Sequence, residues 1–219
     1  MSNSAIELNN VSKSYSQGGK DICVLNDVNF EVREGELVSI TGPSGSGKTT
    51  LLNIIALIDG LDLGNLHVFG DDLSNLNEKE KSIFRKNNFG FVYQSNNLFD
   101  DFNAIENVAL PLILNGCNKN DAFNESENIL KKFGLLERKT HFPNALSGGE
   151  QQRIAIARAV VNKPRIVIAD EPTGNLDKEN SLIIFDYLKN YADTEKLTVV
   201  MATHNNELAN KCTKEIKLA

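Results

Sequence analysis

The stretch that decides the fold reads Gly42, Pro43, Ser44, Gly45, Ser46, Gly47, Lys48 and Thr49. It matches the pattern GxxxxGK followed by Ser or Thr, in which small residues let the backbone wrap a polyphosphate with its N–H groups turned inward. An apolar strand pattern over residues 36–41 precedes the loop, and apolar residues at helical spacing follow it as far as Ile58. Strand, loop and helix in this order predict a nucleotide-binding core.

Three residues at the end of this stretch are expected to handle ATP directly. Lys48 would neutralise the β- and γ-phosphates, and the hydroxyl of Thr49 would ligate Mg²⁺. Thr50 lies next to them, at the start of a helix whose positive dipole end faces the phosphates. ATP and Mg²⁺ are therefore the predicted ligands of residues 42–50.

Two adjacent carboxylates, Asp170 and Glu171, end an apolar strand pattern over residues 165–169. Neighbouring carboxylates repel each other, so a divalent cation beside them is physically sensible. Asp170 would hold Mg²⁺ through water, and Glu171 would polarise the water that attacks the phosphate. An acidic turn before Pro172 is the alternative, but with the phosphate loop upstream the pair predicts an ATPase.

A second glycine-rich segment lies between the loop and the acidic pair and reads Ser147, Gly148, Gly149 and Glu150. Ser147 is suited to begin a helix, and the two glycines leave backbone amides accessible to an anion. One chain has no use for two γ-phosphate sites around one nucleotide. We therefore expect this segment to cap the ATP bound by a second copy, so that the chain works as a homodimer.

Three further side chains are candidates because of their place in the pattern. Gln94 ends a strand and could reach Mg²⁺ or the attacking water, with a solvent-facing glutamine as the alternative. His204 directly follows the last clear strand, where parallel sheets gather their ligands, and could donate to the γ-phosphate. Tyr15 could stack on adenine, which is worth ~1–3 kcal/mol, or it is a surface aromatic.

Strands alternate with helices along most of the chain, which predicts an α/β fold with a mostly parallel central sheet flanked by helices. Residues 6–11 and 24–32 alternate in hydrophobicity and indicate an antiparallel β portion at the N-terminus. The apolar runs typical of buried parallel strands cover residues 36–41, 89–93, 165–169 and 198–202. We expect one domain, 1–219, with an inserted helical subdomain over about residues 95–160.

Composition and charge narrow the class of protein. The 23 Lys and Arg residues against 29 Asp and Glu give a net charge of −6, which disfavours binding to nucleic acid and to anionic lipid. No apolar run approaches the ~20 residues that cross a bilayer, and residues 1–7 lack a signal-peptide pattern. The three scattered cysteines, Cys23, Cys117 and Cys212, favour a reducing cytosol.

The motifs occur in the order typical of the ATP-binding cassette family, which the chain resembles over nearly its whole length. They are residues 42–49, Gln94, residues 146–150, the pair 170–171, residues 175–177 and His204. The resemblance implies a P-loop NTPase cassette that dimerises head to tail, with Asp177 at the seam between the copies. It also implies that Gln94 and the loop after it border a groove for a short cytoplasmic helix of a membrane subunit.

Finer features resemble a subgroup that serves lipoprotein release, macrolide export and cell division. Residues 169–177 look like that group, and residues 91–94, 97–102 and 106–111 are most similar to its lipoprotein-releasing ATPases. The resemblance implies a peripheral protein at the cytoplasmic face of the bacterial inner membrane, with two integral permease subunits as partners and lipoproteins as indirect cargo. A macrolide-type exporter, a cell-division complex and a soluble cassette protein of DNA repair or translation are the alternatives.

Two residues depart from the pattern of the family. Glu150 stands where Gln is more usual in the glycine-rich segment, and this variant is common in the subgroup. Asn205 follows His204 where the family usually shows Asp. Neither departure touches the phosphate chemistry expected of residues 42–50.

Overall fold

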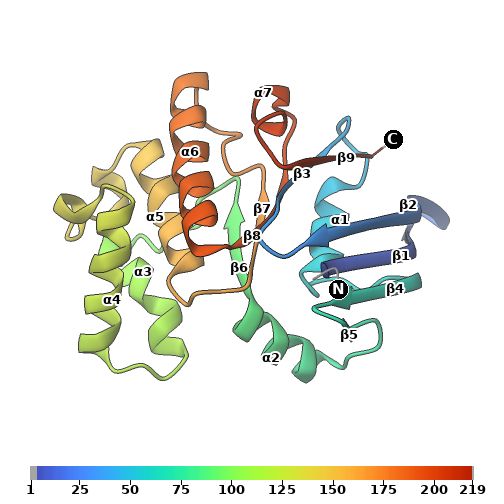
Figure 1. The fold of residues 1–219 in the computed structure, drawn as a ribbon, viewed down its shortest axis with the longest axis horizontal. Helices are drawn as coiled ribbons and strands as arrows, with labels where there is room; N and C mark the ends of the chain where they lie inside the picture. Colours follow the sequence, from blue (N-terminus) through green and yellow to red (C-terminus); the bar gives the residue numbers. More distant parts are fainter. Residues whose placement is uncertain (1–3, 219) are drawn as a thin grey trace.

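Two β-sheets and seven α-helices build the fold in a computed structural model that describes residues 4–218 (Figure 1). The limits of the predicted domain, 1 and 219, lie outside these residues. In the part of the chain that is described, no helix has both the length and the apolar character needed to cross a membrane.

An antiparallel sheet forms the N-terminal part, with its strands in the order β2-β1-β4-β5. The strands are β1 (Ser4–Gln17), β2 (Lys20–Arg33), β4 (Leu63–Val68) and β5 (Asp71–Asp72). Its two long strands contain the segments 6–11 and 24–32, whose alternating hydrophobicity predicts such a sheet. The antiparallel β portion is therefore confirmed.

Five parallel strands form the second sheet in the order β6-β7-β8-β3-β9. They are β3 (Leu37–Thr41), β6 (Phe89–Tyr93), β7 (Ile166–Asp170), β8 (Thr198–Ala202) and β9 (Lys214–Lys217). Parallel strands point their carboxyl ends to one edge of a sheet, so the residues that follow β3, β7 and β8 gather there. That edge carries the phosphate loop, the acidic pair and His204.

Side chains of the parallel strands alternate between two buried clusters, one on each face of the sheet. In β8, Val199 and Met201 join the first cluster, whereas Val200 and Ala202 join the second. The first cluster continues into helices α3 to α6, and the second continues into α1 and the antiparallel sheet. Because both faces are covered, the strands β3, β6, β7 and β8 are mostly apolar in the sequence, whereas the edge strand β9 is polar and mostly exposed.

Helices flank the parallel sheet, as the sequence predicts (Figure 1). They are α1 (Lys48–Ile55), α2 (Glu78–Asn88), α3 (Ala104–Leu114), α4 (Lys119–Lys132), α5 (Gly148–Val160), α6 (Lys178–Glu195) and α7 (Asn206–Ala209). Helices α3, α4 and α5 occupy the predicted helical block at residues 95–160. Helix α1 ends at Ile55 rather than Ile58, because Leu57 adopts a left-handed backbone conformation with φ 58°.

Candidate nucleotide-binding site

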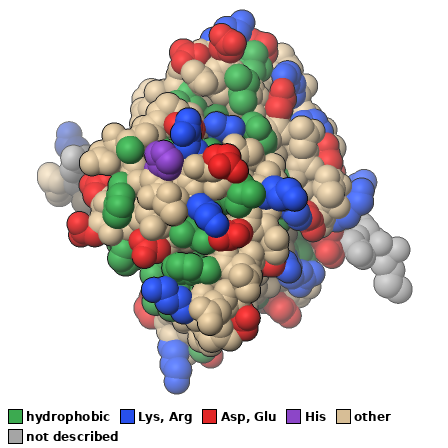
Figure 2. Space-filling model, turned by 90° about the vertical axis from the view of Figure 1, so that its left-hand side faces the viewer, with side chains coloured by type: hydrophobic (Ala, Val, Ile, Leu, Met, Phe, Trp, Pro, Cys, Tyr) green, Lys and Arg blue, Asp and Glu red, His purple; other side chains and the backbone are tan. Residues whose placement is uncertain are grey.

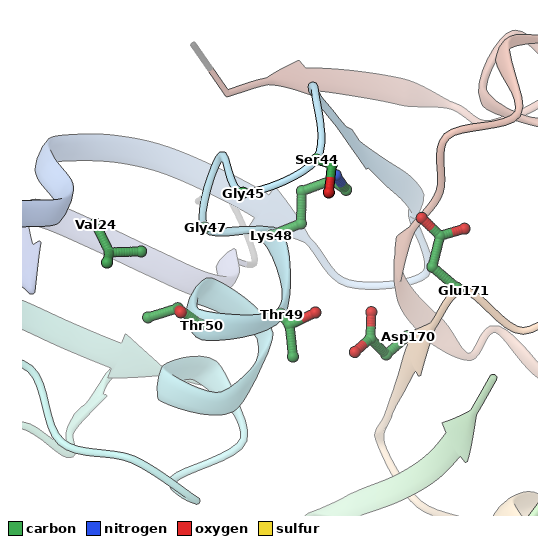
Figure 3. A pocket seen from close by; sticks show the side chains of 9 residues that line it. All are labelled: Val24, Ser44, Gly45, Gly47, Lys48, Thr49, Thr50, Asp170 and Glu171. Atoms are coloured by element: carbon green, nitrogen blue, oxygen red, sulfur yellow. The ribbon is translucent and has the colours of Figure 1, made fainter. Parts of the chain in front are cut away.

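A cavity of about 320 Å³ opens where α1 begins. Its lining residues are Val24, Ser44, Gly45, Gly47, Lys48, Thr49, Thr50, Asp170 and Glu171. The structure thus brings the phosphate loop and the acidic pair together, although more than a hundred residues separate them in the chain. Figure 3 shows the side chains of Thr49 and Asp170 pointing toward one another from α1 and β7.

The phosphate loop is held against β2 by close backbone packing. Gly47 has φ 87°, and a Cβ atom at this position would lie 2.8 Å from Leu25 Cδ2 and 2.9 Å from the Val24 carbonyl oxygen. A larger residue would therefore push the loop away from the strand. Glycine at residue 47 lets the loop turn tightly into α1 and presents its amides at the helix N-terminus.

The loop contains two polar groups suited to an anion. Lys48 Nζ donates to the carbonyl oxygens of Gly42 at 2.9 Å and Pro43 at 3.0 Å, which holds its charge at the mouth of the loop. Ser46 Oγ is buried, and no described residue hydrogen-bonds it. A fixed cation, an orphan hydroxyl and turned-in amides suit a polyphosphate.

Asp170 ends β7 and faces α1 across the cavity. Burial is the main cause that raises the pKa of its carboxyl, and the charge of Glu171 adds to it, whereas the Thr49 hydroxyl and Lys48 oppose the rise. Among residues 4–218 no three His, Cys, Asp or Glu side chains form a metal cluster. One carboxylate and one hydroxyl, completed by substrate phosphates and water, nevertheless fit Mg²⁺.

Glu171 and His204 are bonded to each other at the carboxyl ends of β7 and β8. The Glu171 carboxylate lies 2.9 Å from His204 Nδ1 and accepts the His204 backbone N–H at 3.3 Å. Glu171 also has φ 46°, a left-handed conformation that is costly for a residue with a side chain. The left-handed backbone and the two contacts with His204 together hold this carboxylate in place.

Gln94 lies at the end of β6 but does not line the phosphate cavity. Its Nε2 donates to Asn175 Oδ1 at 3.1 Å, and Asn175 Nδ2 donates back to the Gln94 carbonyl oxygen at 3.1 Å. A Cβ atom on Gly174 would lie 2.9 Å from Gln94 Nε2. The structure therefore brings Gln94 together with the loop that carries Asp177, and its contact with Mg²⁺ or water stays a prediction.

The second glycine-rich segment forms the N-terminus of α5. Glu150 N–H donates to Ser147 Oγ at 3.3 Å, and the Ser147 N–H donates to Glu150 Oε2 at 2.8 Å, which closes a capping box. The Ser147 backbone, and after it Arg138 at 2.8 Å, lower the pKa of Glu150 in spite of burial. The capping box and the ion pair with Arg138 thus explain why Glu is suited to residue 150.

The Ser147 segment lies away from the phosphate cavity of its own chain, since no residue of α5 lines that cavity. It lies instead beside the start of α6, where Asp177 caps the helix by accepting the Asn180 N–H at 3.0 Å. A Cβ atom on Gly149 would be 3.4 Å from Asn180 Oδ1. Ser147, Gly148 and Asp177 are exposed, so the surface expected at a dimer seam is open in the single chain.

Tyr15 projects from β1 next to the phosphate loop. Its hydroxyl donates to Asp59 Oδ2 and also hydrogen-bonds the Thr50 side chain, which lines the cavity. The ring is 40% exposed and therefore accessible to a base. The sequence did not predict that Asp59 is the hydrogen-bond partner of Tyr15, because Asp59 lies 44 residues away in a loop without a motif.

The family described as ABC transporter matches residues 25–174. The lipoprotein-releasing system ATP-binding protein LolD of Rickettsia bellii is 45% identical over all of this chain and 96% of its own length, and that of Pseudoalteromonas translucida is 42% identical over 96% and 91%. An uncharacterized ABC transporter ATP-binding protein, YknY of Bacillus subtilis, is 44% identical over 96% and 91%.

Solved structures agree with the sequence comparisons. The dimeric bacterial ABC transporter cassette MJ0796 is 40% identical, with a TM-score of 0.88 over 97% of this chain and 94% of that one. A dimeric post-hydrolysis state of the same cassette, bound to ADP and phosphate, is 39% identical, again with a TM-score of 0.88. Both cover the antiparallel portion, the parallel sheet and the helical block of this chain.

Proposed function

Because this chain belongs to the ABC transporter family and is an ATP-hydrolysing cassette, we propose that it powers the release of lipoproteins from the inner membrane toward the outer membrane. The main observation that supports this proposal is the similarity over the whole chain, at 40–45% identity, to proteins named for lipoprotein release. Two copies of the chain and two integral permease subunits form the proposed complex. It lies at the cytoplasmic face, without nucleic acid as a partner.

Residues of one chain bind the triphosphate of ATP in this proposal. The loop amides and Lys48 hold the phosphates, and Thr49 with Asp170 would hold Mg²⁺, which supplies charge neutralisation at the phosphate oxygens. Glu171, fixed by His204, orients the attacking water and accepts its proton. The left-handed backbone of Glu171 keeps the carboxylate aimed without rearrangement.

The second copy completes the site. Its Ser147, Gly148 and Gly149 lie at an exposed helix N-terminus, where backbone amides and the helix dipole attract the γ-phosphate. Asp177 lies at the same surface and would contact the other copy at the seam. ATP then joins two chains, and hydrolysis separates them.

The loop after Gln94 is proposed as the contact for the membrane subunits. Phe99 and Phe102 are 53% and 37% exposed, with ring centroids 5.6 Å apart. The buried Asn107 holds this loop, donating to the Phe99 carbonyl at 3.1 Å and the Phe102 carbonyl at 2.9 Å. Figure 2 shows exposed hydrophobic side chains on the face of the helical block.

Replacing Phe99 or Phe102 with Ala should weaken the membrane complex while the isolated protein keeps its ATPase activity. Each ring would lose a buried apolar contact worth about 2 kcal/mol, or roughly thirtyfold in affinity. Co-purification with the permease subunits from detergent extract measures this. Ile183→Ala on α6, at 43% exposure, is the matched control and should keep the complex. If both Phe variants retain the complex, the permease subunits bind a different surface of the chain.

The cargo is tested by reconstitution of the chain with its co-purified permease subunits in vesicles that contain a labelled lipoprotein. MgATP should release the lipoprotein into solution, and Glu171→Gln should stop the release. A second candidate, export of a small molecule of the macrolide type, comes from the resemblance of residues 169–177 to the subgroup that includes macrolide exporters. Drug transport without lipoprotein release would support that candidate instead.

A further inference from the structure

Asp59 occupies a fixed place between β1 and α1. Its Oδ1 accepts the Gly60 N–H at 2.7 Å and lies 3.2 Å from Lys13 Nζ, and its own N–H donates to the Asn53 carbonyl oxygen at 3.1 Å. The second oxygen accepts the Tyr15 hydroxyl. Both carboxylate oxygens are therefore committed, and the loop after α1 is tied to the strand that carries Tyr15.

The protonation states of this group favour the same arrangement. The hydrogen bond to Asp59, and next burial, raise the pKa of Tyr15, so its hydroxyl remains a donor. Burial opposes ionisation of Asp59, but the bonds from Tyr15 and Lys13 outweigh it and lower the pKa. A neutral phenol donating to a charged carboxylate is a strong hydrogen bond.

Lys13 contacts the Tyr15 ring. Its Nζ lies 5.2 Å from the ring centroid, within the range of a cation–π contact. Lys13 is itself held by Asp59 and by Asp62 at 3.3 Å. A tethered cation thus lies over the ring, and Tyr15 remains 40% exposed for a stacking partner.

Helix α1 connects this group to the phosphate loop. The helix begins with Lys48 and Thr49 at the cavity and ends at Ile55, shortly before Asp59. The chain folds back after the helix, because the Asp59 N–H donates to the Asn53 carbonyl oxygen. Tyr15 therefore contacts Thr50 in the first turn of α1, beside the cavity, and Asp59 in the loop that follows the helix.

We propose that Asp59 is a positioning residue for the nucleotide base: it holds the Tyr15 phenol so that the ring stacks on the base while the phosphates lie in the loop. This inference rests on the proposed function, in which Tyr15 contacts ATP. It adds a residue that touches no part of the nucleotide and acts through another side chain.

The test compares the binding of ATP with that of inorganic tripolyphosphate, which has no base. Asp59→Asn should weaken ATP binding by about three- to tenfold, a fraction of a full stacking contact, and leave tripolyphosphate binding unchanged. The KM for ATP should rise while kcat stays the same. Asp21→Asn, which removes the charge that accepts from Ser16 next to Tyr15, is the matched control and should leave both ligands unaffected.

A double variant separates positioning from general support of the fold. In a Tyr15→Phe background the hydroxyl is gone, so Asp59→Asn should cause no further loss of ATP affinity. Equal losses for ATP and tripolyphosphate would overturn the inference, as would unchanged ATP binding in Asp59→Asn where Tyr15→Ala weakens it. Unchanged ATP binding in Lys48→Ala would instead overturn the proposed function.

Discussion

The phosphate loop and the Ser147 segment have the same local chemistry and different surroundings. Each is a glycine-rich stretch that ends in a helix N-terminus, so each offers backbone amides to an anion. The phosphate loop lies in a cavity with Lys48, Asp170 and Glu171 around it. The Ser147 segment is exposed, and its serine bonds Glu150 of its own helix.

This difference indicates where the missing part of each site lies. Figure 1 shows α1 and α5 on opposite sides of the parallel sheet, so the two anion sites of one chain face different regions. The phosphate cavity has a lysine and carboxylates but no group that covers the γ-phosphate from the other side. The Ser147 segment can cover a phosphate but lies away from those side chains. The two therefore complement each other across two copies of the chain.

The largest effect is expected at the hydrolytic end of the phosphate cavity. Glu171→Gln removes the proton acceptor while keeping the shape, and turnover should fall by about 10²–10⁴-fold. ATP binding remains, so a dimer should accumulate with MgATP and appear by size-exclusion chromatography with light scattering. Glu195→Gln, on the exposed end of α6, is the control and should keep wild-type turnover. Undiminished turnover in Glu171→Gln would place the base elsewhere.

The next prediction tests whether each ATP site is shared between two copies of the chain or built by one copy alone. Lys48→Ala disables the loop, and Gly148→Asp places a negative charge against the γ-phosphate. The helix tolerates that change because Asp is favourable in a first turn and a Cβ there would lie an ordinary 3.5 Å from Leu176 Cδ2. Each variant alone should be inactive.

Mixing these two variants should restore activity. Half of the dimers are then mixed, and each mixed dimer has one intact site, so about a quarter of the wild-type sites return. ATPase assays before and after co-refolding or subunit exchange measure the gain. A mixture as inactive as its components would contradict the shared site.

A smaller effect concerns stability at the phosphate cavity. Burial, and then the charge of Glu171, raise the pKa of Asp170 above its ordinary value of 3.8. The folded state therefore holds this proton more tightly than the unfolded state, and stability falls as pH rises from the ordinary to the raised pKa. Asp170→Asn removes that loss, so the free protein should melt at a higher temperature at neutral pH.

The gain from Asp170→Asn should vanish at a pH below 3.8, where the aspartate is protonated in both states. Thermal unfolding without nucleotide or Mg²⁺, recorded over a range of pH, measures it. Asp186→Asn, an exposed residue that pairs with Lys211, is the control and should show no such pH-dependent gain. A variant that is less stable at neutral pH would show that burial does not penalise this carboxylate.

Much of the fold follows from the sequence because local patterns specify it. The run before the phosphate loop and the runs ending at Asp170 and Ala202 are short, mostly apolar and followed by polar residues, which is how a buried parallel strand appears in a sequence. Helix α2 was not predicted from the sequence, because none of its residues is buried and it lacks an apolar stripe. Its capping box, Asn77 with Glu80, was the available signal.

The sequence predicted the residues that belong to a ligand-binding motif. It did not predict which side chains of the site contact each other. Lys48, Thr49 and Asp170 lie in the cavity that their motifs predict. The bond of His204 to Glu171 and the bond of Tyr15 to Asp59 join residues 33 and 44 positions apart. Such pairs depend on strand order and loop path, which no local pattern carries.

One crosslinking measurement tests the shared site most directly. Ser44→Cys and Ser147→Cys are introduced together after Cys23, Cys117 and Cys212 have been replaced with Ser, and a short bifunctional maleimide is added with and without MgATP. Covalent dimers are expected in MgATP only, and none with either cysteine alone. A bridge within one polypeptide, or no bridge between two in MgATP, would contradict the shared site.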